Sequence, residues 1–157
     1  MAWETIRKNK AAVAATVRLA DYDEACRSFR WRDARDGLPG GGLDIAYEAL
    51  DRHVAKGKGG KTALRWIGRD LATRHYSSAD LAAGTNRFAN VLRGLGIGKG
   101  DRVYSLLGRV SELDIAALGT LKNGSVFSPL FSAFGPEPVK ARASIREAAA
   151  LVTTEAF

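Results

Sequence analysis

The chain has 157 residues, of which 46% are hydrophobic and 26% charged, and its formal net charge is +7. This length fits one domain of ordinary size, and the composition is that of a globular protein rather than a disordered one. A single cysteine, Cys26, excludes an internal disulfide, and the apolar stretches are too short to span a membrane.

The positive charge invites comparison with proteins that bind nucleic acids. The basic residues, however, alternate with acids along the chain, as in "DEACRSFRWRDARDG", and no run of five like charges occurs. This pattern is typical of solvated helix faces. We therefore expect no nucleic-acid partner and no membrane partner. Binding to nucleic acid driven by charge alone stays an alternative, and it would weaken as salt is added.

The N-terminal region is predicted to form an amphipathic helical extension. Residues 1 to about 36 are rich in Arg, Asp and Trp, and "GLPGGG" (37–42) then stops the helix, because a proline among glycines cannot continue it. We therefore predict an extension over residues 1–40 and an incomplete second domain over residues 41–157.

A helix and a β-hairpin are predicted next. In "LDIAYEALDRHVAKG", apolar residues recur at spacings of three and four, and Gly57 lies just past the helix end. The residues on this face are Leu43, Ala46, Leu50 and Val54. "KTALRWIG" has the composition of a short strand, with "TRHYS" as its partner.

Ser77 and Asp80 stand three residues apart before an apolar run, which predicts a capping box at a helix start. The helix continues to the glycines that begin at Gly94. Its predicted buried face comprises Leu81, Phe88, Val91, Leu92 and Leu95.

From residue 77 onward, helices and strands alternate. The strands are "DRVYSLL", "SVFSPLF" and "ALVTT", separated by the helices "SELDIAALGTLKNG" and "PEPVKARASIREA". Such alternation predicts an α/β fold in which a parallel sheet carries helices on its faces.

The stretch "GLGIGKGD" (94–101) resembles a phosphate-binding loop only superficially. It leaves a helix and enters a strand, so a phosphate would meet the partially negative end of that helix. The glycine spacing also differs from the dinucleotide and triphosphate motifs. We therefore predict a structural turn, with a left-handed cap at Gly94 or Gly96 and a turn over Gly98–Gly100.

The unit "TNRFANVLRGLGIGKGDRV" closely resembles the start of the large domain of the adenylate-forming acyl-CoA ligases. Two further stretches resemble the acetyl-CoA synthetase branch. These are "GGLDIAYEALDRH" (41–53), with Asp44 where asparagine is more usual, and "ALGTLKNGSVFSPLFSAFGPEPVKARASIREAAALVTT". The resemblance covers most of residues 30–157.

The resemblance implies the N-terminal part of an AMP-forming acetate–CoA ligase of the cytoplasm, active in acetate metabolism. Such an enzyme uses ATP, magnesium and coenzyme A: the acid is adenylated, pyrophosphate leaves, and the thiol of coenzyme A then displaces AMP. The family's phosphate loop, rich in Ser, Thr and Gly and ending in Lys-Gly, has no counterpart in residues 1–157. We therefore expect no catalytic residue, no metal ligand, no tight cofactor binding and no turnover by this segment alone.

One element near a ligand is implied by the same resemblance. In the related enzymes the segment after the second sheet strand passes close to the adenine end of coenzyme A. Here the corresponding residues are Phe131, Ser132 and Ala133, although two glycines are common in place of the last two. The alternative is that Phe131 and Phe134 belong to the core at the sheet edge. Arg142 is predicted to lie on a solvated helix face.

A non-catalytic function is the alternative to the enzyme. The chain would then be a truncated product, or an interaction module that pairs with another ligase subunit. A three-stranded parallel sheet with an unpaired edge exposes backbone groups and apolar surface, so we expect poor solubility unless the rest of the ligase or a partner covers it.

Overall fold

The computed structural model describes residues 9, 21–38, 44–145 and 147–155. The chain divides into two compact units, Met1–Gly37 and Leu38–Phe157. Positions 39–42 of the predicted break at 37–42 and the predicted boundary between residues 40 and 41 lie outside the described residues, as does Leu43.

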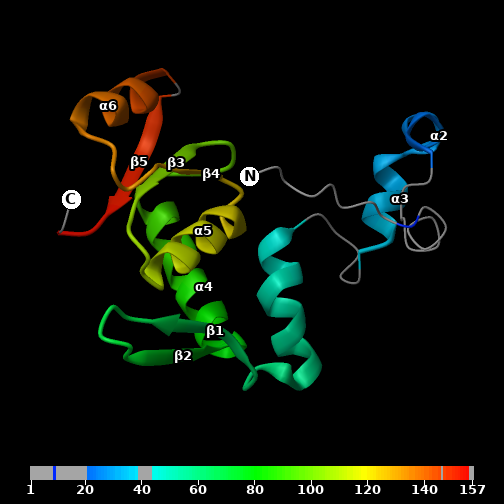
Figure 1. Ribbon diagram of the computed structural model, residues 1–157, viewed down its shortest axis with the longest axis horizontal. Helices are drawn as coiled ribbons and strands as arrows, with labels where there is room; N and C mark the ends of the chain where they lie inside the picture. The colour runs from blue at the N-terminus through cyan, green and yellow to red at the C-terminus, as the bar shows by residue number, and fades with distance from the viewer. Residues whose placement is uncertain (1–8, 10–20, 39–43, 146, 156–157) are drawn as a thin grey trace, which may run out of the picture. The chain divides into compact units, whose positions relative to one another are not determined.

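The second unit contains the predicted parallel sheet, with three strands in the order β4-β3-β5 (Figure 1). The strands are β3 (Arg102–Leu106), β4 (Val126–Pro129) and β5 (Ala148–Thr153). The helices α4 (Ser78–Gly94), α5 (Glu112–Lys122) and α6 (Pro136–Ile145) precede them in turn. In the register, Arg102 of the central strand stands beside Val126 on one side and Ala148 on the other. The predicted α/β fold class is confirmed.

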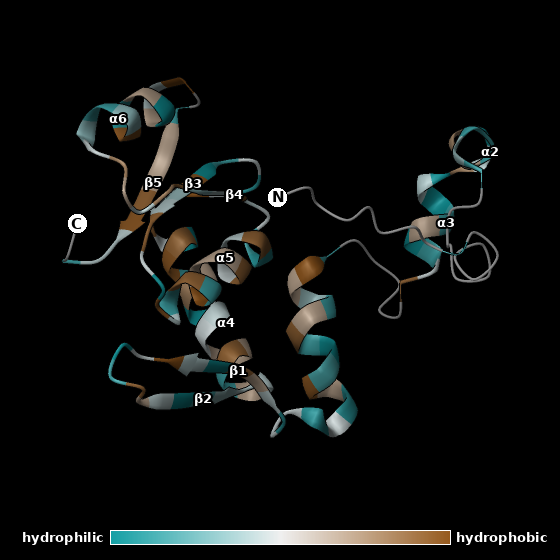
Figure 2. Cartoon of the chain, in the orientation of Figure 1, coloured by the Kyte–Doolittle hydropathy of each residue, from teal (hydrophilic) through white to brown (hydrophobic). Residues whose placement is uncertain are grey.

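The central strand separates two packed faces. Val103 is fully buried and packs with Leu92 and Ile97 on the side of α4. The next residue, Tyr104, points to the opposite face, because successive side chains alternate along a strand. Its hydroxyl donates to the carbonyl of Arg142 at 3.2 Å and so fastens α6 to the sheet. Figure 2 shows the apolar residues concentrated on β5, α4 and α5.

A helical segment, residues 45–58, precedes the sheet and includes the π-helical stretches η1 (Tyr47–Asp51) and η2 (Val54–Lys58). Leu50 is buried against Leu81, with Val54 beside them, so the predicted apolar face is confirmed there. Gly57 takes a left-handed φ of 74°. A residue with a Cβ adopts that value at a cost, which explains a glycine at this point.

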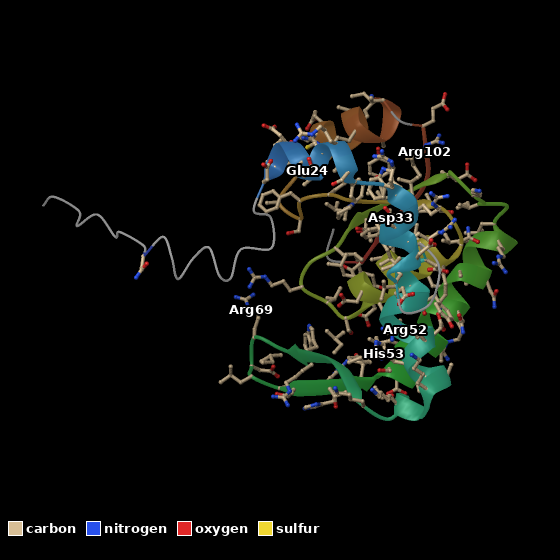
Figure 3. The ribbon with its side chains drawn as sticks, turned by 90° about the vertical axis from the view of Figure 1, so that its right-hand side faces the viewer. Glu24, Asp33, Arg52, His53, Arg69 and Arg102 are labelled. Atoms are coloured by element: carbon tan, nitrogen blue, oxygen red, sulfur yellow. The ribbon has the colours of Figure 1, made fainter. Side chains whose placement is uncertain are left out.

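The predicted β-hairpin is also present. Strand β1 (Thr62–Ile67) pairs antiparallel with β2 (Thr73–Ser77), and Arg65 stands opposite His75. Figure 3 shows the hairpin beside the helical segment, with Arg52 and His53 on that segment and Arg69 in the hairpin loop.

Helix α4 begins with the predicted capping box. The N–H of Asp80 donates to Ser77 Oγ at 3.1 Å, and the N–H of Ser77 donates to Asp80 Oδ2 at 2.9 Å. The predicted buried face is wrong at Val91 and Leu95, whose side chains are 55% and 68% exposed.

Small residues share the buried face of α4 with Leu81 and Leu92. Thr85 and Ala89 are buried on it, because α5 approaches there closely. A Cβ at Gly119 of α5 would lie 2.9 Å from the carbonyl oxygen of Thr85. Gly84 likewise makes room for Ile115. The small residues let the two helices approach, and the larger Val91 and Leu95 fall outside the contact.

The glycine stretch after α4 is a turn, as predicted. Gly96 and Gly100 have left-handed φ values of 77° and 85°, and the N–H of Gly98 donates to Asp101 Oδ2 at 2.8 Å. The N–H of Gly100 donates to the carbonyl of Gly124 at 3.0 Å. These bonds occupy the backbone amides that a phosphate would need.

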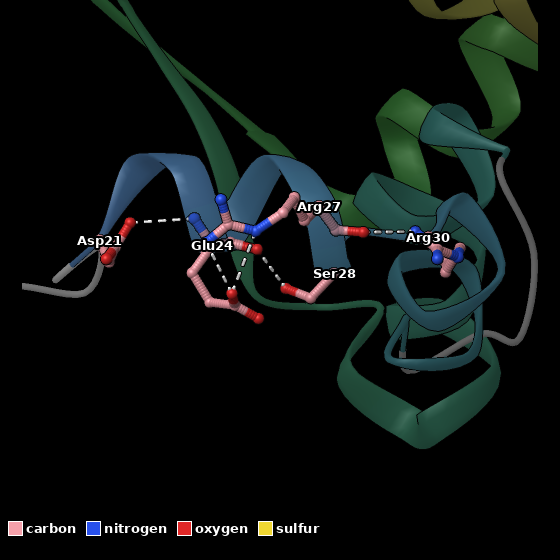
Figure 4. Close-up of polar contacts among 5 residues, drawn as sticks. All are labelled: Asp21, Glu24, Arg27, Ser28 and Arg30. Atoms are coloured by element: carbon pink, nitrogen blue, oxygen red, sulfur yellow. Dashed lines mark hydrogen bonds and ion pairs between the residues drawn. The ribbon is translucent and has the colours of Figure 1, made fainter.

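The first unit contains α2 (Tyr22–Ser28) and α3 (Trp31–Asp36). The predicted helical extension is interrupted at Phe29 and Arg30, which are not helical. The Arg30 guanidinium donates to the carbonyl of Arg27 at 2.9 Å, which satisfies a group at the end of α2 (Figure 4). Asp21 caps the start of that helix. Neither helix has a buried residue among those described, so the expected apolar face is not formed within this unit.

Candidate functional site

The three predicted ligand-proximal residues lie in the turn that joins β4 to α6. The N–H of Phe134 donates to the carbonyl of Phe131 at 3.0 Å and closes this turn over Ser132 and Ala133. Phe131 is 66% exposed, so it is not a core residue, whereas Phe134 is half-buried. The alternative that both phenylalanines belong to the core is therefore wrong for Phe131.

An open cavity of about 470 Å³ lies beside this turn. Phe131 lines the cavity, whereas Ser132 and Ala133 do not. Its walls come from β3, from the end of β4, from the turn and from α6: Tyr104, Pro129, Leu130, Phe131, Phe134, Arg142 and Ile145. The turn therefore brings one predicted residue to the cavity and leaves the other two behind it.

An arginine and two aromatic rings contact one another in the cavity wall. The guanidinium carbon of Arg142 lies 4.3 Å from the ring centroid of Phe134. The rings of Phe131 and Phe134 meet edge to face, with centroids 5.7 Å apart. Arg142 also donates to the carbonyl of Pro138 at 3.2 Å. Its side chain is nevertheless exposed, as the predicted solvated helix face requires.

This arrangement suits a ligand with a flat ring and an anionic group. Exposed aromatic faces bind planar rings, and a guanidinium binds phosphate or carboxylate oxygens. No carboxylate lines the cavity.

Tyr104 and Arg142 were not predicted as residues of one site, because they are 38 positions apart in sequence. The alternation of residues along β3 would have placed Tyr104 on the α6 side, but Arg142 has no comparable local indication.

The cavity has no carboxyl group that could serve in acid–base chemistry. The pKa of Asp80 is lowered by bonds from the Ser77 hydroxyl and backbone, and the pKa of Asp114 is raised by partial burial. Neither carboxyl lines the cavity. Among the described residues, no group of three His, Cys, Asp or Glu side chains could hold a metal ion. No described helix is long and apolar enough to cross a bilayer.

Residues 50–157 match the protein family described as "AMP-binding enzyme". The acetyl-coenzyme A synthetase of Bacillus subtilis is 37% identical over 147 residues, which cover 91% of this chain and 26% of the relative. The acetyl-coenzyme A synthetase of Deinococcus radiodurans is 37% identical over 139 residues, covering 88% of this chain and 21% of the relative.

Solved structures agree in fold. An acyl-CoA synthetase of Brucella canis superposes with a TM-score of 0.73 at 33% identity, covering 86% of this chain and 25% of that one. A benzoate CoA ligase of Burkholderia xenovorans, at 22% identity, shares the fold with a TM-score of 0.63, covering 73% and 22%. The chain thus spans about a quarter or less of the length of the relatives it matches.

Proposed function

This chain belongs to the AMP-binding enzyme family, and we propose that it forms the N-terminal segment of an AMP-forming ligase that joins acetate, or another short acid, to coenzyme A. In that reaction the acid's carboxylate attacks the α-phosphorus of ATP and displaces pyrophosphate. The thiolate of coenzyme A then attacks the acyl carbon and displaces AMP. The free carboxylate has no good leaving group. Adenylation attaches AMP to it, and AMP leaves readily when the thiolate attacks.

The continuous match to acetyl-coenzyme A synthetases carries this proposal. It runs through 147 residues, so it includes the helical segment, the hairpin and the sheet rather than one motif. Acetate as the acid rests on these relatives' names, because no described residue forms an acid pocket of its own.

We place the nucleotide end of coenzyme A at the cavity beside Phe131. The exposed Phe131 ring offers a face to an adenine ring, and the Arg142 guanidinium, which lies over Phe134, offers a cation to a phosphate. Ser132 and Ala133 lie in the turn behind Phe131, so they would act by shaping the backbone there. Two residues with a Cβ in this turn restrict how closely a ligand can approach.

ATP and magnesium would be held by parts of the enzyme other than this segment. Residues 1–157 contain no loop rich in Ser, Thr and Gly that ends in Lys-Gly. The segment's contribution is to build one side of the sheet and to present the cavity. We therefore expect it not to turn over alone, and the whole enzyme to act in acetate metabolism in the cytoplasm.

The test compares the 157-residue chain with the product of its reading frame extended past Phe157. Acetate-dependent exchange of labelled pyrophosphate into ATP reports the first step, and acetyl-CoA formation reports the second. We expect both activities from the extended protein and neither from the 157 residues. A stop codon directly after Phe157, or exchange that ignores added acetate, would overturn the proposal.

A non-catalytic role remains the second candidate, because both outer strands of the sheet have a free side. Within the part of the chain that the structure describes, β4 and β5 pair only with β3. Free strand edges pair readily with another chain. If the frame stops at Phe157, we expect the chain to be soluble only together with a partner subunit. A monodisperse monomer that unfolds cooperatively would contradict this role.

A further inference from the structure

Residues 52–77 concentrate the positive charge of the chain. They contain seven Lys or Arg residues and one Asp, a formal charge of +6 beside +7 for all 157 residues. They form the end of the helical segment and the whole β1–β2 hairpin. Arg52 and His53 lie on the helical segment and Arg69 lies in the hairpin loop (Figure 3). Elsewhere acids nearly balance the bases, so the charge is not evenly spread.

Most of these cations are not neutralised. Arg52 pairs with Glu48 at 2.9 Å, and the Arg74 guanidinium lies 5.5 Å from the centre of the Trp66 ring. The carboxylate of Asp70 accepts the N–H of Ala72 and pairs with no base among the described residues. The remaining bases likewise have no acid partner in the described part of the chain: Lys56, Lys58, Lys61, Arg65 and Arg69.

One face of the hairpin turns away from the rest of the unit. On the inner face, the Tyr76 hydroxyl meets Ser111 Oγ at 2.9 Å, and Trp66 Nε1 donates to the carbonyl of Arg109 at 2.7 Å. Side chains alternate between the faces of a strand. The outer face therefore carries Arg65 and, opposite it, His75.

Two aliphatic side chains accompany the charges at the loop end of the hairpin. Ile67, at the end of β1, is 59% exposed, and Leu71, in the loop, is 80% exposed. Arg69 lies between them in the chain. The hairpin thus combines Arg65 on its outer face and Arg69 in its loop with an exposed apolar end.

Contrary to the expectation of no membrane partner, which rested on the mixed charges of the N-terminal region, we propose that the β1–β2 hairpin docks this chain onto the surface of an anionic phospholipid bilayer. Leu71 and Ile67 enter the headgroup region, while Arg65 and Arg69 meet lipid phosphates. Basic residues beside a few apolar side chains are the combination that holds a peripheral protein at an anionic interface. The binding is reversible and weakens as salt is added.

A lipid surface fits this hairpin better than a nucleic acid does. Binding to single strands relies on exposed aromatic rings on which bases stack. Trp66 and Tyr76, the aromatic residues of the hairpin strands, are half-buried and hydrogen-bonded inward. The exposed aliphatic side chains of the hairpin would make no favourable contact with the phosphate backbone of a nucleic acid. A lipid–water interface, by contrast, accommodates both apolar and basic side chains.

Flotation of the chain with lipid vesicles on a density gradient tests the proposal, because vesicle-bound protein rises whereas aggregated protein sinks. One set of vesicles contains phosphatidylserine and phosphatidylcholine, and the other contains phosphatidylcholine alone. We expect binding to the anionic vesicles, with Arg69→Gln weakening it about fivefold and Leu71→Ser about tenfold. The matched controls Arg87→Gln and Leu95→Ser remove an exposed base and an exposed leucine from α4 and its C-terminal end.

The controls distinguish binding through this hairpin from non-specific adsorption of the protein to vesicles. Equal binding to both kinds of vesicle, no binding to either, or equal losses in the control variants would overturn the proposal. So would a duplex DNA that binds in an Arg69-dependent manner while the vesicles do not. Catalysis is not measured, so failure here leaves the proposed ligase function untouched.

Discussion

The ammonium of Lys122 lies 2.9 Å from Asp51, a residue 71 positions earlier in the chain. The same nitrogen donates to Thr85 Oγ1 at 3.0 Å and to Asn86 Oδ1 at 2.8 Å. One side chain of α5 therefore joins the helical segment before the hairpin to α4. The Lys122 side chain is only 11% exposed, so its charge depends on these partners.

Replacing Lys122 with Met should lower the free energy of unfolding by about 2 kcal/mol, because three acceptors lose their shared donor and Asp51 keeps an unpaired charge. Chemical denaturation measures the change. Lys140→Met is the matched control, since Lys140 is exposed on α6. Equal stability of the two variants would mean that the Lys122 contacts contribute nothing net.

Ser105 offers a change in the opposite direction. Its hydroxyl is buried in β3 and has no hydrogen-bond partner. Ser105→Ala should therefore leave stability unchanged or raise it by up to about 1 kcal/mol, because an unsatisfied polar group is removed. In Ser125→Ala, by contrast, a bond to the Gly98 carbonyl at 2.7 Å is lost, and stability should fall by about 1 kcal/mol. Thermal unfolding of the two variants tests whether the Ser105 hydroxyl is truly unsatisfied.

The capping box makes stability depend on pH. Bonds from Ser77 lower the pKa of Asp80 below its ordinary value of 3.8, so the ionised carboxylate stabilises the folded state above that pH. This contribution is lost as the pH falls through the lowered pKa. Asp80→Asn should therefore be less stable than the parent at pH 7, with the difference shrinking below about pH 4. A difference that stays constant with pH would show that the charge is not responsible.

Ionisation of Asp114 should affect stability in the opposite direction to ionisation of Asp80. Partial burial raises its pKa, so ionisation opposes folding above its ordinary value. Asp114→Asn should be more stable than the parent at neutral pH, and this gain should vanish in acid. Both variants remove one carboxylate. A difference between their stabilities at neutral pH therefore reports the surroundings of each carboxylate and not the loss of a charge in general.

The close approach of α4 and α5 depends on Gly119. A Cβ there would meet the carbonyl oxygen of Thr85 and a ring carbon of Phe88, each at 2.9 Å. Gly119→Ala should therefore cost about 1–3 kcal/mol, because two packed helices must separate. Gly94→Ala meets no neighbouring atom and should be neutral or slightly stabilising. Denaturant midpoints of the pair compare the two effects within one fold.

The cavity beside Phe131 predicts a defect confined to one substrate. In the extended enzyme, Phe131→Ala should raise the KM for coenzyme A about tenfold, because an aromatic face for its adenine ring is removed. Acetate-dependent pyrophosphate exchange, which does not need coenzyme A, should stay unchanged. Val91→Ala, at an exposed apolar residue of α4, serves as the control. A loss of exchange would place Phe131 in a structural role instead.

The sequence predicts those features of the fold that depend on interactions between residues close together in the chain. The Ser77–Asp80 box, the left-handed turn at Gly96 and the alternation of helices and strands all depend on residues a few positions apart. Hydrophobicity alone predicts the wrong face of α4 at Val91 and Leu95, because the approach of α5 decides which residues of that helix are buried. The position of Arg142 in the cavity depends on β3, and the role of Lys122 depends on Asp51, so neither could be predicted from neighbouring residues.

The central position of β3 also has a consequence for how the chain is made. Arg102 emerges from a ribosome 46 residues before its neighbour Ala148 in the register. At the usual pace of synthesis this delay is about 2 to 9 s. During that interval β3 has no partner on one side, while the helical segment, the hairpin and α4 are already complete. The nascent chain therefore exposes its most deeply buried strand for seconds, and a chaperone that binds extended segments would find its target there rather than in the hairpin.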